Sequence, residues 1–273
     1  MTEKRLSSRN SHSALQWWVG ILFSIPVLLN AQNNPVATIP LKEPVVSAYV
    51  DRPGDLYVQF ESGKITKYDI NGKLLAEYTP KDDIVLFDPR DGARAFMYSS
   101  KGQWYSFAFF GSANKVKLKE EYAIEPVLAC ASGDQDVWLL DKADASLKKI
   151  NTTRQTVDVE AVLPDQLKTV DLSGIKMREY QGFLFLQVPG SGLHIFSGMG
   201  RLLKSFDDTS ISYFNFLGEE LYFATANKLI FYDLFDGDTR QMENKDGTGI
   251  LLMTDVRWYS ILPSRVEVYL ANP

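Results

Sequence analysis

Histidine, cysteine and basic charge are all scarce in this 273-residue chain, and each shortage excludes a class of function. The sequence contains two histidines, His12 and His194, and one cysteine, Cys130. A zinc site needs three or four nitrogen or sulfur ligands, and one cysteine allows no intramolecular disulfide. Lysine and arginine total 29, against 34 acidic residues. Without a basic surplus to neutralise phosphates, no nucleic-acid partner is expected.

Catalytic motifs and helical patterns are missing as well. A Ser–His–Asp triad would have to use His194, and no G-x-S-x-G elbow precedes a helix. Gly190-Ser191-Gly192 is better interpreted as a hairpin turn. Beyond residue 35, apolar residues almost never recur at helical spacing, and turn residues interrupt the chain at short intervals. These observations predict an all-β fold, and they assign no catalytic residue, no cofactor and no metal site.

The first 31 residues have the layout of a secretory signal peptide. Basic residues lie near the start: Lys4, Arg5 and Arg9. An uncharged, mostly apolar run follows from Ala14 to Leu29, and small Ala31 precedes polar residues. We expect a signal helix over residues 1–31 that is removed on export, which leaves the mature chain in the periplasm or outside the cell. The alternative is an uncleaved anchor, although a spanning helix needs about 20 apolar residues and Pro26 interrupts this run.

A short apolar and aromatic motif recurs along the rest of the chain. Its six copies are centred on Tyr57, Phe96, Trp138, Leu184, Tyr222 and Trp258. The steps between them, about 36 to 46 residues, are close to the period of four-stranded propeller blades. In most copies one strand-like segment precedes the motif and two follow it, and the last is the most polar. This order predicts blades whose outermost strand faces water.

Residues 55–78 show the repeat unit most clearly. Leu56–Phe60, Ile65–Ile70 and Leu74–Tyr78 have strand composition, and Asn71-Gly72 predicts a two-residue hairpin turn with positive φ at both residues. The segment from Ile65 to Lys73 fits the pattern I-x-x-[FY]-D-x-x-[GN]-[KR]. This unit and residues 228–240 therefore resemble repeats of the NHL/YVTN/TolB-like propeller group. The resemblance covers residues 36–273 as architecture, and it implies a propeller of a group that serves mainly as binding scaffolds, with some enzymes.

The two ends of the repeat region complement each other. The sixth unit stops at Pro273 after its third strand, while a spare strand, Val36–Leu41, precedes the first unit. Pairing of this strand with Val266–Leu270 would close the ring and remove the exposed sheet edge at the seam. Pro40 suits an outermost strand, which needs ladder bonds on one side only. We therefore predict one domain over residues 36–273, a six-bladed β-propeller closed by its N-terminal strand.

Several single residues have structural interpretations. Asp69 and Asp233 each end a strand at a turn, where a carboxylate accepts backbone N–H bonds. The segment Asp233–Asp238 lacks the terminal glutamate of a calcium loop. Cys130 lies in an apolar run and is expected in the core. A long loop is expected over residues 163–174, with one helical turn at Asp165–Lys168.

Surface loops carry the remaining functional signal. In a propeller, the loops that join the second strand to the third, and the fourth strand to the next blade, share one face. Residues expected on that face, which we call the loop face, are mostly acidic: Asp82, Asp83, Lys101, Asp207, Asp208 and Asp246. An acidic face favours cationic or polar partners, either a protein or a small polar ligand.

The favoured interpretation is an exported, monomeric, non-enzymatic propeller that acts as a binding scaffold. One alternative is an exported hydrolase or lactonase with a divalent cation on the ring axis, for which the inner strands offer only Asn215 and Glu179. Another alternative is a membrane-tethered envelope assembly factor. Contact with a membrane is expected only in that case, with the signal segment uncleaved.

Overall fold

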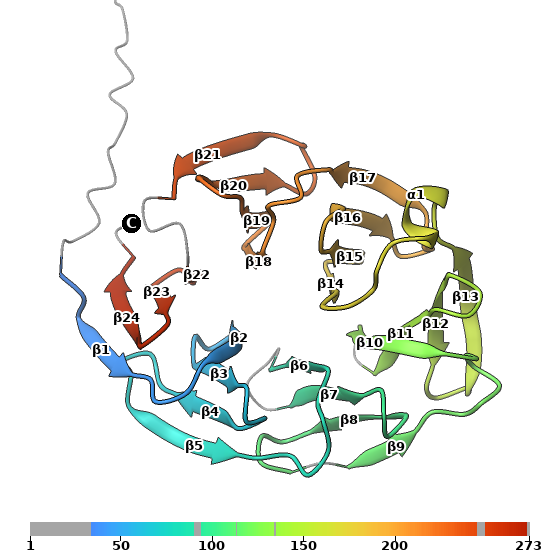
Figure 1. Cartoon of the computed structure of the whole chain (residues 1–273), viewed down its shortest axis with the longest axis horizontal. Helices are drawn as coiled ribbons and strands as arrows, with labels where there is room; N and C mark the ends of the chain where they lie inside the picture. The colour runs from blue at the N-terminus through green and yellow to red at the C-terminus, as the bar shows by residue number, and fades with distance from the viewer. Residues whose placement is uncertain (1–33, 90–93, 113, 134, 245–248, 272–273) are drawn as a thin grey trace, which may run out of the picture. The chain divides into compact units, whose positions relative to one another are not determined.

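The computed structural model describes residues 34–89, 94–112, 114–133, 135–244 and 249–271. The predicted signal segment and Asp246 lie outside these residues. The described part of the chain forms six four-stranded antiparallel sheets around a ring, with one short helix, so the predicted all-β, six-bladed propeller is confirmed (Figure 1). Within the described residues, no helix is both long enough and apolar enough to span a membrane.

Each blade contains four strands, and in five of the six blades these strands are consecutive in the sequence. Blade 1 contains β2 (Val45–Val50), β3 (Leu56–Phe60), β4 (Ile65–Tyr68) and β5 (Leu74–Tyr78). Blade 2 contains β6 (Leu86–Asp88), β7 (Ala95–Ser99), β8 (Trp104–Ala108) and β9 (Lys115–Lys117). Blade 3 contains β10 (Pro126–Ser132), β11 (Asp136–Asp141), β12 (Ser146–Asn151) and β13 (Thr156–Val162).

The second half of the ring follows the same plan. Blade 4 contains β14 (Lys176–Tyr180), β15 (Phe183–Val188), β16 (Gly192–Ser197) and β17 (Leu202–Phe206). Blade 5 contains β18 (Tyr213–Leu217), β19 (Glu220–Ala224), β20 (Lys228–Asp233) and β21 (Thr239–Glu243). Blade 6 contains β22 (Ile250–Met253), β23 (Arg257–Leu262), β24 (Arg265–Leu270) and β1 (Ala37–Pro40). The helical turn α1 spans Asp165–Lys168, as predicted.

Burial changes from the inside of a blade to its outside. All five residues of β3 and of β7 are buried, because both faces of a second strand pack against neighbouring blades. The outermost strands β9 and β21 are almost entirely exposed. The polarity predicted for the fourth strand therefore follows from its position at the rim. Cys130, as expected, is buried in the core.

The N-terminal strand closes the ring. In the antiparallel pairing of β1 with β24, Ala37 lies opposite Val268 and Ile39 lies opposite Val266. The Ile39 side chain is only 5% exposed and packs into the core shared by blades 1 and 6. The predicted pairing is confirmed, and both ends of the described chain are held in one sheet.

Polar side chains of the second strands join neighbouring blades. They bond to the first strand of the next blade or to its flank: Tyr98 Oη to Pro126 O (2.7 Å), Trp138 Nε1 to Glu179 Oε2 (2.7 Å), Met253 N to Tyr222 Oη (2.9 Å) and Tyr259 Oη to Gly54 O (2.8 Å). The aromatic motif seen in the sequence thus fixes the spacing between blades, which fixes the width of the central channel.

The turn at Asn71-Gly72 differs from its prediction. Strand β4 ends at Tyr68, and the loop to β5 covers residues 69–73. Gly72 takes a φ of 81°, but Asn71 is not among the residues with positive φ, so the predicted two-residue turn is wrong. The reason is the carboxylate of Asp69, which accepts the N–H groups of Asn71 and Lys73, both at 2.9 Å. This capping stabilises a longer turn.

Candidate functional site: a funnel with a charged floor

A hollow of about 730 Å³ opens at one end of the central channel, and we call it the funnel. Its lining comes from five blades: residues 50–52, 133, 178–182, 215–218 and 253–255. These residues are the ends of the first strands, which surround the channel in Figure 1, and the turns that follow them. In a propeller, such turns lie on the face opposite the loop face. The funnel is therefore not on the face that the sequence suggested.

Arg178 of β14 forms the floor of the funnel with side chains from two other blades. Its Nη1 donates to Asn215 Oδ1 of blade 5 at 2.8 Å. Its Nη2 lies 3.3 Å from Asp88 Oδ1 of blade 2. Its guanidinium carbon lies 5.5 Å from the ring centre of Phe216, within cation–π range. We call Arg178, Asp88 and Asn215 the crossbar, because they connect three blades across the channel.

A second, smaller cavity of about 70 Å³ lies on the other side of the crossbar. It is lined by first-strand residues such as Ser47, Tyr49 and Lys176, and also by β6 of blade 2, which does not reach the funnel lining; the two cavities share only Arg178 and Asn215. Burial lowers the pKa of Lys176 and raises that of the Tyr49 hydroxyl. The crossbar therefore separates the two cavities, and the funnel ends at a charged floor.

Two acidic residues at the funnel are already engaged by neighbouring donors. Glu179 accepts hydrogen bonds from Gly133 N at 3.1 Å and from Trp138 Nε1. Asp51 accepts from Asp55 N at 2.8 Å and from Tyr57 Oη at 3.0 Å. Burial raises the pKa of Asp51 above its ordinary value. These bonds hold both carboxylates in the wall, where they support the blades.

The wall beside Arg178 is aromatic and rigid. The rings of Tyr180 and Phe216 stack with centroids 4.1 Å apart and an interplanar angle of 8°. Tyr180 Oη donates to Gly218 O at 2.7 Å, which ties the end of β14 to the turn of blade 5. Because the rings are fixed by both contacts, this side of the funnel is formed before any ligand enters.

The loop face brings part of the predicted acidic set together. Asp83 and Lys101 form an ion pair at 2.6 Å, and Asp82 accepts from Trp104 Nε1 at 3.0 Å and pairs with Lys115. The acids of this cluster are therefore balanced by lysines. Further along the chain, Asp207 and Asp208 lie in the connection from blade 4 to blade 5, where Asp208 accepts from Ser210 N at 2.8 Å and from its hydroxyl. No contact joins the two groups in the described residues.

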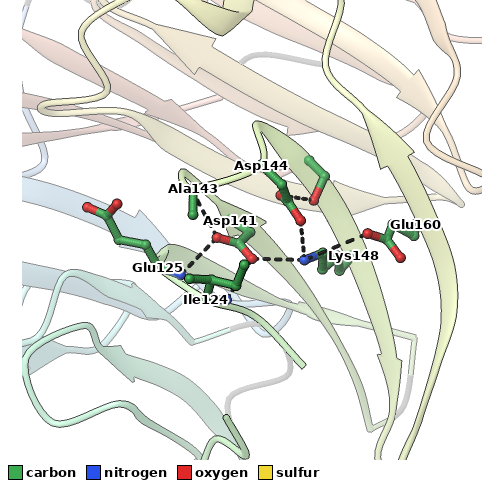
Figure 2. A network of polar contacts seen from close by, with 8 residues as sticks. Ile124, Glu125, Asp141, Ala143, Asp144, Lys148 and Glu160 are labelled. Carbon is green, nitrogen blue, oxygen red and sulfur yellow. Dashed lines mark hydrogen bonds and ion pairs between the residues drawn. The ribbon is translucent and has the colours of Figure 1, made fainter. Parts of the chain in front are cut away.

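A buried ion-pair network lies at the blade 3 loops (Figure 2). Lys148 Nζ lies 2.8 Å from Asp141 Oδ2 and 2.6 Å from Asp144 Oδ2, and its side chain is 7% exposed. Asp141 also accepts the N–H groups of Ile124 and Glu125. The network holds the loop that leads into β10, at Ile124 and Glu125, against the turn between β11 and β12, so its role is structural.

The remaining polar candidates are also explained by local contacts. His194 is 1% exposed, with its ring nitrogens 3.2 Å from Ser191 Oγ and 2.9 Å from Ser205 Oγ. Burial lowers its pKa. Asp233 caps its turn through Phe235 N and Asp236 N, as predicted. Among the described residues, no three His, Cys, Asp or Glu side chains converge as a metal site would require.

Arg178 and Asp88 were not among the sequence candidates. Asp88 ends the otherwise apolar strand β6, and Arg178 lies in β14, a first strand with three charged residues; these charges on inner strands were the available signal. The sequence alone does not place them together, because they come from blades that are not adjacent in the chain. The inner-strand residues considered from sequence were Asn215, which is in the crossbar, and Glu179, which is in the wall.

The comparison with solved structures agrees with this architecture, while no family model and no curated protein matches the chain. A streptogramin B lyase structure aligns with a TM-score of 0.55 at 11% identity, covering 87% of each chain. Virginiamycin B lyase from Staphylococcus aureus aligns with a TM-score of 0.54 at 13% identity, covering 85% of this chain and 83% of the lyase.

A third similar structure is the extracellular domain of a putative hybrid two-component system from B. thetaiotaomicron. It aligns with a TM-score of 0.50 at 15% identity, over 81% of this propeller and 32% of that chain. At such identities the likeness concerns the fold alone. The funnel and its crossbar must therefore be interpreted from their own chemistry.

Proposed function

We propose that this chain is an exported, non-enzymatic propeller that binds a ligand in the funnel. The observation that carries the proposal is the hollow of about 730 Å³ with walls from five blades and a charged floor. Its volume lies in the range of small-molecule sites, about 300–1,000 Å³. A rigid wall lowers the conformational cost of binding, because fewer side chains are ordered by the ligand.

Export is supported by the layout of residues 1–31 and is compatible with the extracellular domain among the similar structures. The proposal places the mature chain in the periplasm or outside the cell. The loop face is kept as a docking surface for a protein, since Asp83 and Lys101 expose 72% and 82% of their side chains.

An enzyme is the second candidate, because two of the similar structures are lyases. A cation-dependent hydrolase would hold a divalent ion on the ring axis. Metal analysis of dialysed protein separates the two functions: a stoichiometric divalent ion would favour the enzyme. Mass spectrometry of the mature N-terminus tests the membrane-tethered alternative, which requires residues 1–31 to be retained.

The binding proposal is tested by blocking the funnel. Arg52 and Asp255 are exposed at its rim, so the double variant Arg52→Trp/Asp255→Trp narrows the entrance. Lys117→Trp, on the exposed outer strand β9, is the matched control. Native mass spectrometry of protein isolated from its own host should show a bound small molecule in the wild type and the control, but not in the rim variant. Retention of the bound mass by the rim variant would place the site elsewhere.

A further inference from the structure

The guanidinium of Arg178 has more donors than its neighbours use. It carries five N–H donors, and its polar contacts in the described residues are one hydrogen bond to Asn215 and one ion pair with Asp88 at 3.3 Å. Its Nε is buried and has no hydrogen-bond partner among those residues. Since the side chain is 18% exposed and lines the funnel, unused donors lie at the funnel floor.

The charges around the floor favour an anion. Lys176 lies two residues before Arg178 on β14, and both line the small cavity behind the crossbar. Asp88 lines the same small cavity, whereas the funnel acids Asp51 and Glu179 each lie 3.8 Å from a wall lysine, Lys67 and Lys149 respectively. Both wall carboxylates therefore have a cation of their own, and at the floor Arg178 and Lys176 lie around the small cavity together with Asp88.

We propose that the funnel ligand carries a carboxylate, which Arg178 binds at the floor. This inference rests on the proposed function and names the chemistry of its ligand. A planar carboxylate matches the planar donor fork of a guanidinium. The stacked rings of Tyr180 and Phe216 lie beside Arg178 and suit a flat apolar body attached to that carboxylate.

Asp88 acts as an internal competitor in this scheme. Its carboxylate lies 3.3 Å from the guanidinium, which is longer than the roughly 2.7–2.9 Å of a charge-assisted hydrogen bond. A ligand carboxylate must share Arg178 with it. Neutralising Asp88 should therefore tighten carboxylate binding, whereas removing the Arg178 charge should abolish it. If the Arg178–Asp88 ion pair only supported the fold, substitution of either residue would change the carboxylate affinity in the same direction.

The experiment compares benzoate with benzamide, which has nearly the same shape but no charge. Binding is followed by calorimetry and by the Arg178 Nε–H resonance in ¹⁵N-labelled protein. Benzoate should bind the wild type at least about tenfold more tightly than benzamide, the factor expected of a charge-assisted hydrogen bond. Asp88→Asn should increase the benzoate affinity, and Arg178→Gln should remove the preference over benzamide.

Asn215→Asp keeps the acceptor for Arg178 and adds a second acid at the floor, so it should weaken benzoate binding. This variant provides an independent test if Arg178→Gln or Asp88→Asn fails to fold. Equal binding of both probes would overturn the carboxylate assignment and leave the funnel as a ligand site. If neither probe binds, the carboxylate assignment is overturned as well. The proposed function is then decided separately, by whether the rim variant loses the small molecule that the wild type carries. A benzoate affinity that falls in Asp88→Asn would also contradict the scheme.

Discussion

Arg178 Nη2 lies 3.3 Å from Asp88 Oδ1, although the two residues belong to blades 4 and 2, which are separated in the ring by blade 3. Their side chains are 18% and 4% exposed. A contact between non-neighbouring blades forms only when the ring has its native diameter. The crossbar therefore links ring closure to the shape of the funnel.

Removing the arginine should destabilise the folded ring. Arg178→Met takes the cation from a nearly buried carboxylate, and the expected loss is about 1–3 kcal/mol in the free energy of unfolding. Arg154→Met is the control, because Arg154 pairs with Asp158 at the surface and is 66% exposed; an exposed pair of this kind contributes little to stability. Urea denaturation measures both, and equal losses would argue against a buried crossbar.

Ring closure makes its own prediction at β1. Ile39→Ala removes a buried side chain from the seam between blades 1 and 6, and should lower the free energy of unfolding by about 2–5 kcal/mol. Thr38→Ala, on the exposed side of the same strand, should change it little. If thermal or urea unfolding shows similar small effects for both variants, β1 does not seal the ring.

The network of Figure 2 predicts a pH dependence of stability. Burial alone would raise the pKa of Asp141, but hydrogen bonds from Lys148 and from the Ile124 and Glu125 amides outweigh it, so this pKa lies below its ordinary value. A carboxyl with a depressed pKa in the folded state stabilises the protein above its unfolded pKa, about 3.9, and this contribution is lost as pH falls through the folded value.

Asp141→Asn should therefore be less stable than the wild type at pH 7, and the difference should shrink below about pH 4. Denaturant unfolding across pH 2–7 measures the two curves. Parallel curves over that whole range would show that Asp141 titrates alike in the folded and unfolded chains.

The loop face is tested with a cationic probe, a hexalysine peptide at low salt. Asp207→Lys/Asp208→Lys should weaken its binding more than Asp82→Lys/Asp83→Lys, because the latter pair is balanced by Lys101 and Lys115. Exposed charges are screened by salt, so binding should also fall as ionic strength rises. Unchanged binding in both double variants would remove the loop face from the proposal.

The sequence predicted the blades well because their signals are local. Alternating strands, turn residues and the aromatic motif around Trp138 each act within one unit, and the spare strand followed from counting strands. The turn after β4 was mispredicted because the capping carboxylate of Asp69 competes with the preference of Asn71-Gly72.

The candidate site was less predictable for a physical reason. Arg178 and Asp88 meet only after blades from different parts of the chain assemble, and neither residue has a distinctive local pattern. The loop-face residues Asp82, Asp83 and Lys101 could be placed together, since the two loops that carry them belong to neighbouring positions in the repeat. The sequence could not show that Asp82 pairs with Lys115 and that Asp83 pairs with Lys101.

Hydrogen–deuterium exchange of the exported protein, with and without the small molecule recovered from its host, tests the central claim most directly. The account predicts slower exchange on binding in the turns at residues 51–55, 181–182, 218–219 and 254–256, which surround the funnel. Protection confined to the loops at residues 82–83 and 207–208, or no protection in the funnel turns, would contradict it.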